Sequence, residues 1–248
     1  MTTPEGVMPA PAVTNDASAM DDIIEIFYAP SRVFARRRDN PKFWAAFFIF
    51  SILLALGIWV MMRNYADVLE VQMRKQMAAA MAKNPQLTPE MAEKSQRVGQ
   101  TLAPIIAIFV GVVSTLMLGL TVWIVGKLFA AKASLAHGMV IATLASFPKI
   151  IDMVIAAVQA LAMGTAGVTN MMAATPSLAR FAPAGVSPAV LGVLSRFSIG
   201  TIWATILIAI GLHVIGRISK GRAYGAAAVI WLLATAVAVM GAARQAAG

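Results

Sequence analysis

The chain has 248 residues and a formal net charge of +9, with 59% hydrophobic and 12% charged residues. Soluble domains have about 45 to 50% apolar and about 25% charged residues, so this composition excludes an ordinary soluble domain and predicts an all-α polytopic membrane bundle. In such a protein an excess of cations indicates topology, and we expect no nucleic-acid partner.

The first 42 residues precede any long apolar run. Residues 1–20 contain no Lys or Arg and are rich in Pro, Ala and Thr, which predicts a disordered tail and not a signal peptide. Residues 21–42 have apolar side chains at helical spacing, followed by a basic cluster of Arg36, Arg37 and Arg38. We expect this segment to lie on the cytoplasmic membrane surface, with the three arginines facing lipid phosphates.

Five apolar segments follow and predict five transmembrane helices. Residues 43–62 carry no charge and would extend about 30 Å as a helix, the thickness of the hydrocarbon core. In the second segment Gly111, Thr115 and Gly119 recur at spacing four, which lets another helix pack closely. The other spans are expected at residues 102–128, 136–163, 188–216 and 223–243, so the membrane domain covers residues 43–243.

Residues 63–101 form one long polar connection. Leu69 and three methionines recur every four residues as far as Met81, Pro85 interrupts that helix, and Pro89 suits the first turn of another. The pattern predicts a helical hairpin outside the bilayer. Its Met row is either ordinary packing within the hairpin or a face for a partner protein.

Charge placement indicates the orientation. Five cations precede the first span and five more lie in two very short turns, whereas the other ends of the spans carry nine cations over a much longer stretch of chain. Because cations concentrate on the cytoplasmic side, we expect the N-terminus inside and the C-terminus outside a bacterial inner membrane.

Polar residues at the centre of the third span are the main candidate site. Pro148, Lys149 and Asp152 lie there, and Lys149 and Asp152 are spaced to pair on one helical face. One interpretation is a substrate, ion or proton site at a broken helix; the other is a structural ion pair that fixes the helix to its neighbours.

Residues typical of catalytic and metal centres are scarce. There is no Cys, and the two histidines, His137 and His213, are expected to be interfacial hydrogen-bonding residues more readily than proton relays. Metalloprotease, serine hydrolase and phosphate-loop motifs are absent. The sequence therefore predicts a protein without catalytic residues, metal or cofactor.

Two short motifs resemble those of the Yip1 domain family. Residues 26–30, Ile-Phe-Tyr-Ala-Pro, resemble the family's Asp-Leu-Tyr-Gly-Pro at Tyr28 and Pro30, and residues 143–148 resemble its Gly-Tyr-x-x-x-Pro at Pro148. Residues 30–34, Pro-Ser-Arg-Val-Phe, are similar to the bacterial members. The resemblance implies five spans and a cytoplasmic N-terminus; eukaryotic relatives bind prenylated Rab GTPases in vesicle trafficking, a partner that a bacterial relative would not have.

These observations favour a non-enzymatic membrane scaffold or adaptor. It would act through its N-terminal segment, its hairpin and the lipid bilayer, with a membrane-protein partner or a second copy. The alternative is a small transporter or channel subunit with a site at Pro148, Lys149 and Asp152.

Overall fold

The computed structural model describes residues 18–84, 86, 88–168, 171–183 and 185–247. These residues form helices joined by turns, and their only β-pairing is an isolated bridge between Ser177 and Ser198. Most of the expected N-terminal tail, residues 1–17, lies outside the described residues. Residues 18–20 differ from the prediction, because Ser18 caps a helix that begins at Ala19.

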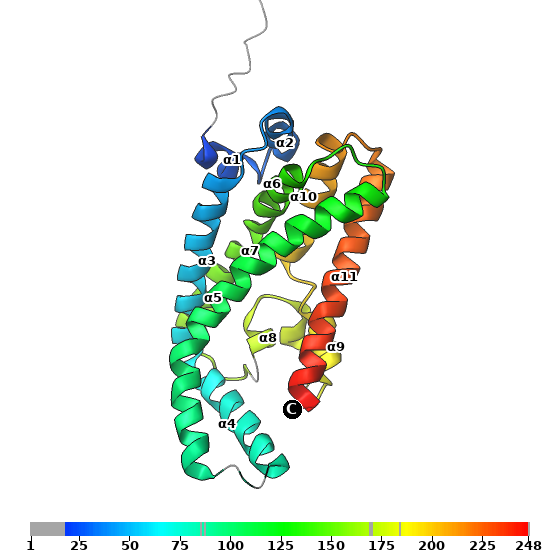
Figure 1. The fold of residues 1–248 in the computed structure, drawn as a ribbon. Helices are drawn as coiled ribbons and strands as arrows, with labels where there is room; N and C mark the ends of the chain where they lie inside the picture. The colour runs from blue at the N-terminus through cyan, green and yellow to red at the C-terminus, as the bar shows by residue number, and fades with distance from the viewer. Residues whose placement is uncertain (1–17, 85, 87, 169–170, 184, 248) are drawn as a thin grey trace, which may run out of the picture.

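Four helical units are long and apolar enough to cross a membrane. They are α3 (Trp44–Asn64), α5 (Pro89–Leu128), the pair α6 (Leu135–Ser146) and α7 (Pro148–Met163), and α11 (Lys220–Ala247). A shorter apolar helix, α10 (Ile199–Val214), lies among them in the bundle (Figure 1). The structure is thus the helical membrane bundle that the composition predicts.

The expected fourth span, residues 188–216, is not one helix. It is divided into α9 (Pro188–Leu194) and α10, with Ser195 at the end of the first and Ser198 capping the second. Ser198 accepts a hydrogen bond from the Thr201 backbone amide at 3.1 Å. A strong cap of this kind starts a new helix inside an otherwise apolar run, which hydrophobicity alone does not reveal.

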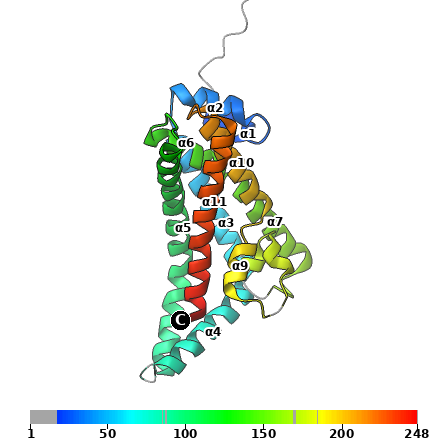
Figure 2. The ribbon, with the colours of Figure 1, turned by 90° about the vertical axis from the view of Figure 1, so that its right-hand side faces the viewer.

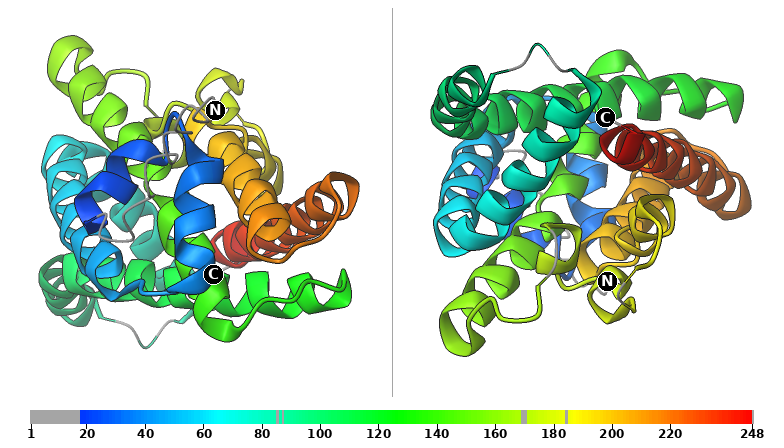
Figure 3. Two further views of the ribbon diagram at one scale, coloured as in Figure 1. Left: turned by 90° about the horizontal axis from the view of Figure 1, so that it is seen from above. Right: turned by 90° about the horizontal axis from the view of Figure 1, so that it is seen from below.

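The two ends of the bundle differ (Figure 1). At one end α1 (Ala19–Glu25) and α2 (Pro30–Asp39) lie across the helix ends, as the view along the axis shows (Figure 3). At the other end are the hairpin and the C-terminus. The hairpin consists of α4 (Ala66–Lys83) and the first part of α5, which continues without a break through Pro104 into its span.

Close helix approach occurs where the sequence has small residues. A Cβ on Gly111 would lie 2.8 Å from the Leu54 side chain of α3, and a Cβ on Gly119 would overlap the Met139 side chain of α6. Thr115 is buried between them and donates its hydroxyl to the Gly111 carbonyl at 3.1 Å. The row predicted to allow close packing therefore faces two neighbouring helices.

Residues between α7 and α10 form a compact, mostly irregular unit. It contains α8 (Met171–Ala174), the 3₁₀ turn η1 (Leu178–Phe181) and α9, and it lies in the half of the bundle nearer the hairpin (Figure 2). Gly192 brings α9 against the α11 backbone, since its Cβ would lie 3.3 Å from the Val239 Cα. This unit brings polar side chains into a largely apolar region.

Candidate functional site

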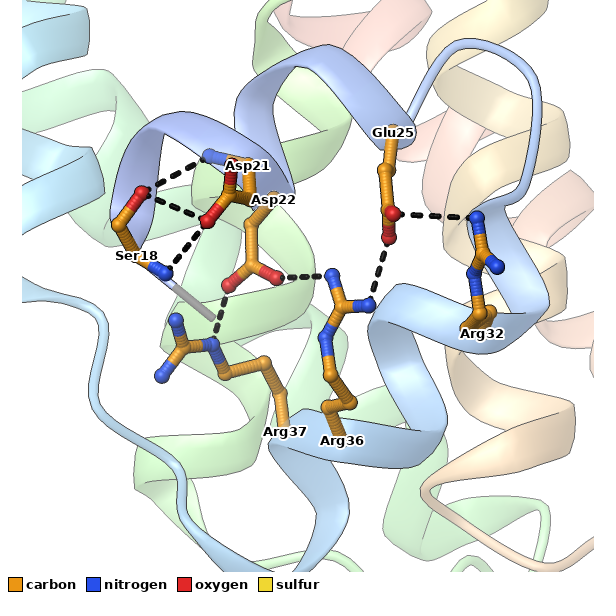
Figure 4. Close-up of polar contacts among 7 residues, drawn as sticks. All are labelled: Ser18, Asp21, Asp22, Glu25, Arg32, Arg36 and Arg37. Atoms are coloured by element: carbon orange, nitrogen blue, oxygen red, sulfur yellow. Dashed lines mark hydrogen bonds and ion pairs between the residues drawn. The ribbon is translucent and has the colours of Figure 1, made fainter. Parts of the chain in front are cut away.

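The N-terminal helices are joined by a buried ion-pair network (Figure 4). Asp22, whose side chain is 2% exposed, accepts hydrogen bonds from Arg36 at 2.7 Å and from Arg37. Glu25 pairs with Arg36 at 2.6 Å and with Arg32 at 3.0 Å. Acids in α1 thus neutralise cations in α2, and the two helices form one unit.

This network differs from the lipid-facing role expected for the basic cluster. Arg36 and Arg37 are only 11% and 13% exposed and point at carboxylates, whereas Arg38 is 37% exposed. Burial by itself lowers the pKa of Arg36, but the hydrogen bonds to Asp22 and Glu25 outweigh it and raise the pKa above its usual value. The physical reason is proximity: the carboxylates of α1 lie within hydrogen-bond distance of these guanidinium groups and occupy the donors that a lipid phosphate would need.

Tyr28 and Pro30, the motif positions of this segment, have different roles. Pro30 is the first residue of α2, where its fixed φ favours helix initiation. Tyr28 lies in the turn between the helices and is 66% exposed. Met20 and Ile24, four residues apart on α1, are 53% and 56% exposed; we call Met20, Ile24 and Tyr28 the N-terminal stripe.

Both histidines bond to backbone carbonyls. His137 donates from Nε2 to the Arg38 carbonyl at 2.8 Å, and this fastens the end of α2 to the start of α6. His213 donates from Nδ1 to the Ile218 carbonyl at 2.7 Å. These contacts agree with the hydrogen-bonding role expected from the sequence.

Two interrupted helices meet near the centre of the bundle. The first break lies between α6 and α7 at Pro148, midway along the apolar unit Leu135–Met163; the second lies between α9 and α10. Beside the second break the Phe197 ring lies 5.3 Å from the Trp231 ring, and Trp231 is midway along Lys220–Ala243. Both breaks therefore lie at mid-depth of the membrane-spanning region.

A single carboxylate joins these breaks. Asp152 Oδ1 accepts a hydrogen bond from the backbone amide of Gly200, in the first turn of α10, at 3.0 Å. A Cβ on Gly200 would lie 2.5 Å from the Asp152 carboxylate and 2.7 Å from the Pro148 carbonyl. Asp152 thus stabilises the positive end of α10, and a glycine is needed for the approach. We call Pro148, Asp152 and Gly200 the junction.

Lys149 and Asp152 do not form the ion pair that their spacing suggested. No ion pair within 4.0 Å joins these two side chains, although both are described. Asp152 is 7% exposed and uses Oδ1 for Gly200. The structure therefore places Pro148 and Asp152 together with Gly200, and leaves Lys149 beside them without that partner.

Sequence reasoning missed further polar residues between the junction and the hairpin end. Tyr65 is 1% exposed and donates its hydroxyl to the Ala156 carbonyl at 3.0 Å. Arg180 donates to the Gln159 side-chain oxygen, and Ser177 is 4% exposed. Tyr65 lies near the start of the polar connection, whereas the other three residues lie in segments that are mostly apolar, and only the isolated Arg180 signalled a buried polar contact. Among the described residues no three His, Cys, Asp or Glu side chains could together hold a metal ion.

Comparisons with known proteins agree with this architecture. The sequence model of the Yip1 domain matches residues 24–242, from the end of α1 nearly to the end of α11. A membrane protein of Bacillus subtilis (strain 168), YknW, is 24% identical over 217 residues, which is 87% of each chain. No solved structure matches significantly. Because the family model matches most of the chain, including the motif prolines Pro30 and Pro148, the chain belongs to the Yip1 domain family.

Proposed function

We propose that this protein is a non-enzymatic membrane scaffold that binds a partner through its N-terminal helices. The observation that carries the proposal is the N-terminal stripe, in which three large apolar side chains are each more than half exposed. Exposed apolar residues at helical spacing are typical of surfaces that bind another protein.

The surrounding contacts support a rigid binding surface. The ion pairs of Asp22 and Glu25 hold α1 against α2, while Val33 and Phe34 of α2 are fully buried against the bundle. A preorganised surface loses little conformational entropy when it binds. The partner would be another membrane protein or a second copy of this chain.

The orientation belongs to the same proposal. With the N-terminus inside, the stripe lies on the cytoplasmic face of a bacterial inner membrane and the hairpin lies outside. Arg38, which is 37% exposed in the last turn of α2, would then contact lipid phosphates. The Met row is a weaker candidate surface, because Met73 packs towards Gly99 of α5 within the hairpin.

A photo-crosslinking experiment tests the scaffold role. A photoreactive amino acid at Ile24 should give one discrete adduct in living cells, and Tyr28→Ala should abolish that adduct by removing the neighbouring apolar contact. Ser31→Ala, an exposed change in the same segment, is the control and should leave the adduct unchanged. Adducts only with lipid, or the same adduct after Tyr28→Ala, would contradict the proposal.

A transporter or channel subunit is the second candidate, and the junction is the observation that favours it. Two interrupted helices that meet at mid-depth around a carboxylate are the usual setting of a substrate or ion site in transporters. In proteoliposomes that report proton and chloride movement, Asp152→Asn should abolish any flux, because it keeps the acceptor for Gly200 but removes the charge. Absence of flux through the unmodified protein would count against this candidate.

A further inference from the structure

A cavity of about 430 Å³ lies beside the junction, between the end of α7, η1 and the start of α10. Its polar lining is Gln159, Ser177 and Arg180, and its apolar lining includes Phe181, Phe197 and Ile202. None of these residues belongs to the N-terminal stripe, so the cavity is independent of the scaffold role.

The polar part of the cavity has unused hydrogen-bonding capacity. Ser177 is 4% exposed, lines the cavity, and its hydroxyl has no hydrogen-bond partner among the described residues. Arg180 donates one hydrogen bond, to the neutral Gln159 side chain, and no described carboxylate lies within ion-pair distance of it. A guanidinium has five donors, so most of them are available to an acceptor that enters the cavity.

The charge balance favours an anion. The residues that line the cavity include one cation, Arg180, and no carboxylate. Unpaired cations inside a membrane bundle are costly, and they are usually neutralised by a counter-charge. A bound anion would supply it.

The remaining lining indicates that the anion carries an acyl chain. Ile202 lies on the apolar helix α10 and is 49% exposed, and Phe181, on the η1 turn, is 81% exposed. Exposed apolar side chains on a membrane bundle suit contact with lipid tails. The cavity therefore joins a cationic, hydrogen-bonding end to a lipid-facing apolar wall, the arrangement that fits one amphiphile.

We propose that this cavity binds the anionic headgroup of a phospholipid from the leaflet on the hairpin side. Arg180 donates to the phosphate in the bidentate manner that guanidinium groups favour, and Ser177 donates a further hydrogen bond. An acyl chain lies over Phe181 and Ile202.

Native mass spectrometry of the full-length protein in mild detergent tests this assignment. Dioleoylphosphatidylglycerol, which is anionic, should bind with one high-affinity site, and dioleoylphosphatidylcholine should bind more weakly. Arg180→Gln should weaken the phosphatidylglycerol site at least about tenfold, the usual size of a lost charge-assisted hydrogen bond. Arg180→Lys should retain part of the affinity.

Arg63→Gln is the matched control, because Arg63 is an exposed cation at the same end of the bundle. It should leave the high-affinity site unchanged. Equal affinity in the wild type and Arg180→Gln, or equal losses in Arg63→Gln and Arg180→Gln, would overturn the proposal. Inorganic phosphate that displaces the lipid at similar concentration would also overturn it, since a free anion would then be the ligand.

A second variant covers the case in which Arg180→Gln does not fold. Ile202→Trp fills part of the cavity from the lipid-facing side without touching Arg180. It should lower phosphatidylglycerol affinity to that of phosphatidylcholine while the protein remains monodisperse. Unchanged selectivity in Ile202→Trp would show that the lipid binds elsewhere.

Discussion

Asp22 shows how one residue organises a whole segment. Its carboxylate is almost fully buried, and the guanidinium groups of Arg36 and Arg37 compensate its negative charge in place of water. Beside it, the Ser18 side chain and backbone donate to Asp21 and lower the pKa of that exposed carboxyl, which keeps the α1 cap charged. A neutral substitution at Asp22 should therefore lower stability more than the same substitution at an exposed acid of this segment.

We expect Asp22→Asn to loosen α1 and α2 from the bundle. The change removes a charge from Arg36 and Arg37, although Glu25 still pairs with Arg36, so the loss should be about 2 kcal/mol. Limited trypsin digestion should then cleave after Arg36 to Arg38 much faster than in the wild type. Arg32→Ala removes an ion pair whose arginine is 57% exposed and should change the rate little. Equal protection of the wild type and Asp22→Asn would refute this role.

At the scale of elements, the junction depends on how closely α7 and α10 approach. Gly200→Ala places a methyl group against the Asp152 carboxylate and the Pro148 carbonyl, and neither can move without shifting a helix end. We expect a loss of about 1 to 3 kcal/mol, measured by unfolding in detergent. Gly241→Ala, also in a helix but with no atom within 4 Å of its added Cβ, should cause no loss. Similar stabilities of the two variants would show that the junction is not tightly packed.

Asp152 and Lys149 should not compensate each other. Asp152→Ala removes the acceptor of the Gly200 amide and should cost about 2 kcal/mol. If Lys149 were its ion-pair partner, adding Lys149→Met would restore stability; because the carboxylate bonds to Gly200, we expect the double variant to be no more stable than Asp152→Ala. Thermal unfolding of the two single variants and the double variant decides this, and recovery in the double variant would contradict the geometry.

At the scale of the whole molecule, the two ends of the bundle should lie on opposite sides of the membrane. The chain has no Cys, so single cysteines can be placed freely. With the N-terminus inside, an impermeant thiol reagent should label a cysteine at Ala78 of the hairpin in intact cells. It should label one at Ser31 only after lysis. The reverse pattern would invert the topology, because cation density alone underlies this prediction.

The family and the helical membrane bundle could both be predicted from sequence motifs and composition. Long uncharged runs require helices, since the bilayer offers no other partner for backbone amides and carbonyls. The hairpin, the break at Pro148, and the close approach of Gly111 and Gly119 to neighbouring helices were likewise evident from local signals. Each of these signals lies within a short stretch of the sequence.

Tertiary structure alone decided which polar groups meet. Arg36 and Arg37 were expected to face lipid phosphates, but they pair with Asp22. Asp152 was expected to pair with Lys149, three residues away, but it accepts a hydrogen bond from Gly200, forty-eight residues away. The cavity at Arg180 arises in the same way, from contacts between segments distant in the chain. The division of the fourth span instead follows from a local contact, the cap of Ser198 on the Thr201 amide, which the hydrophobicity pattern hides. The sequence determined this protein's helices and their membrane setting because the bilayer acts on each segment separately; its polar sites depend on three-dimensional proximity, which no local pattern encodes.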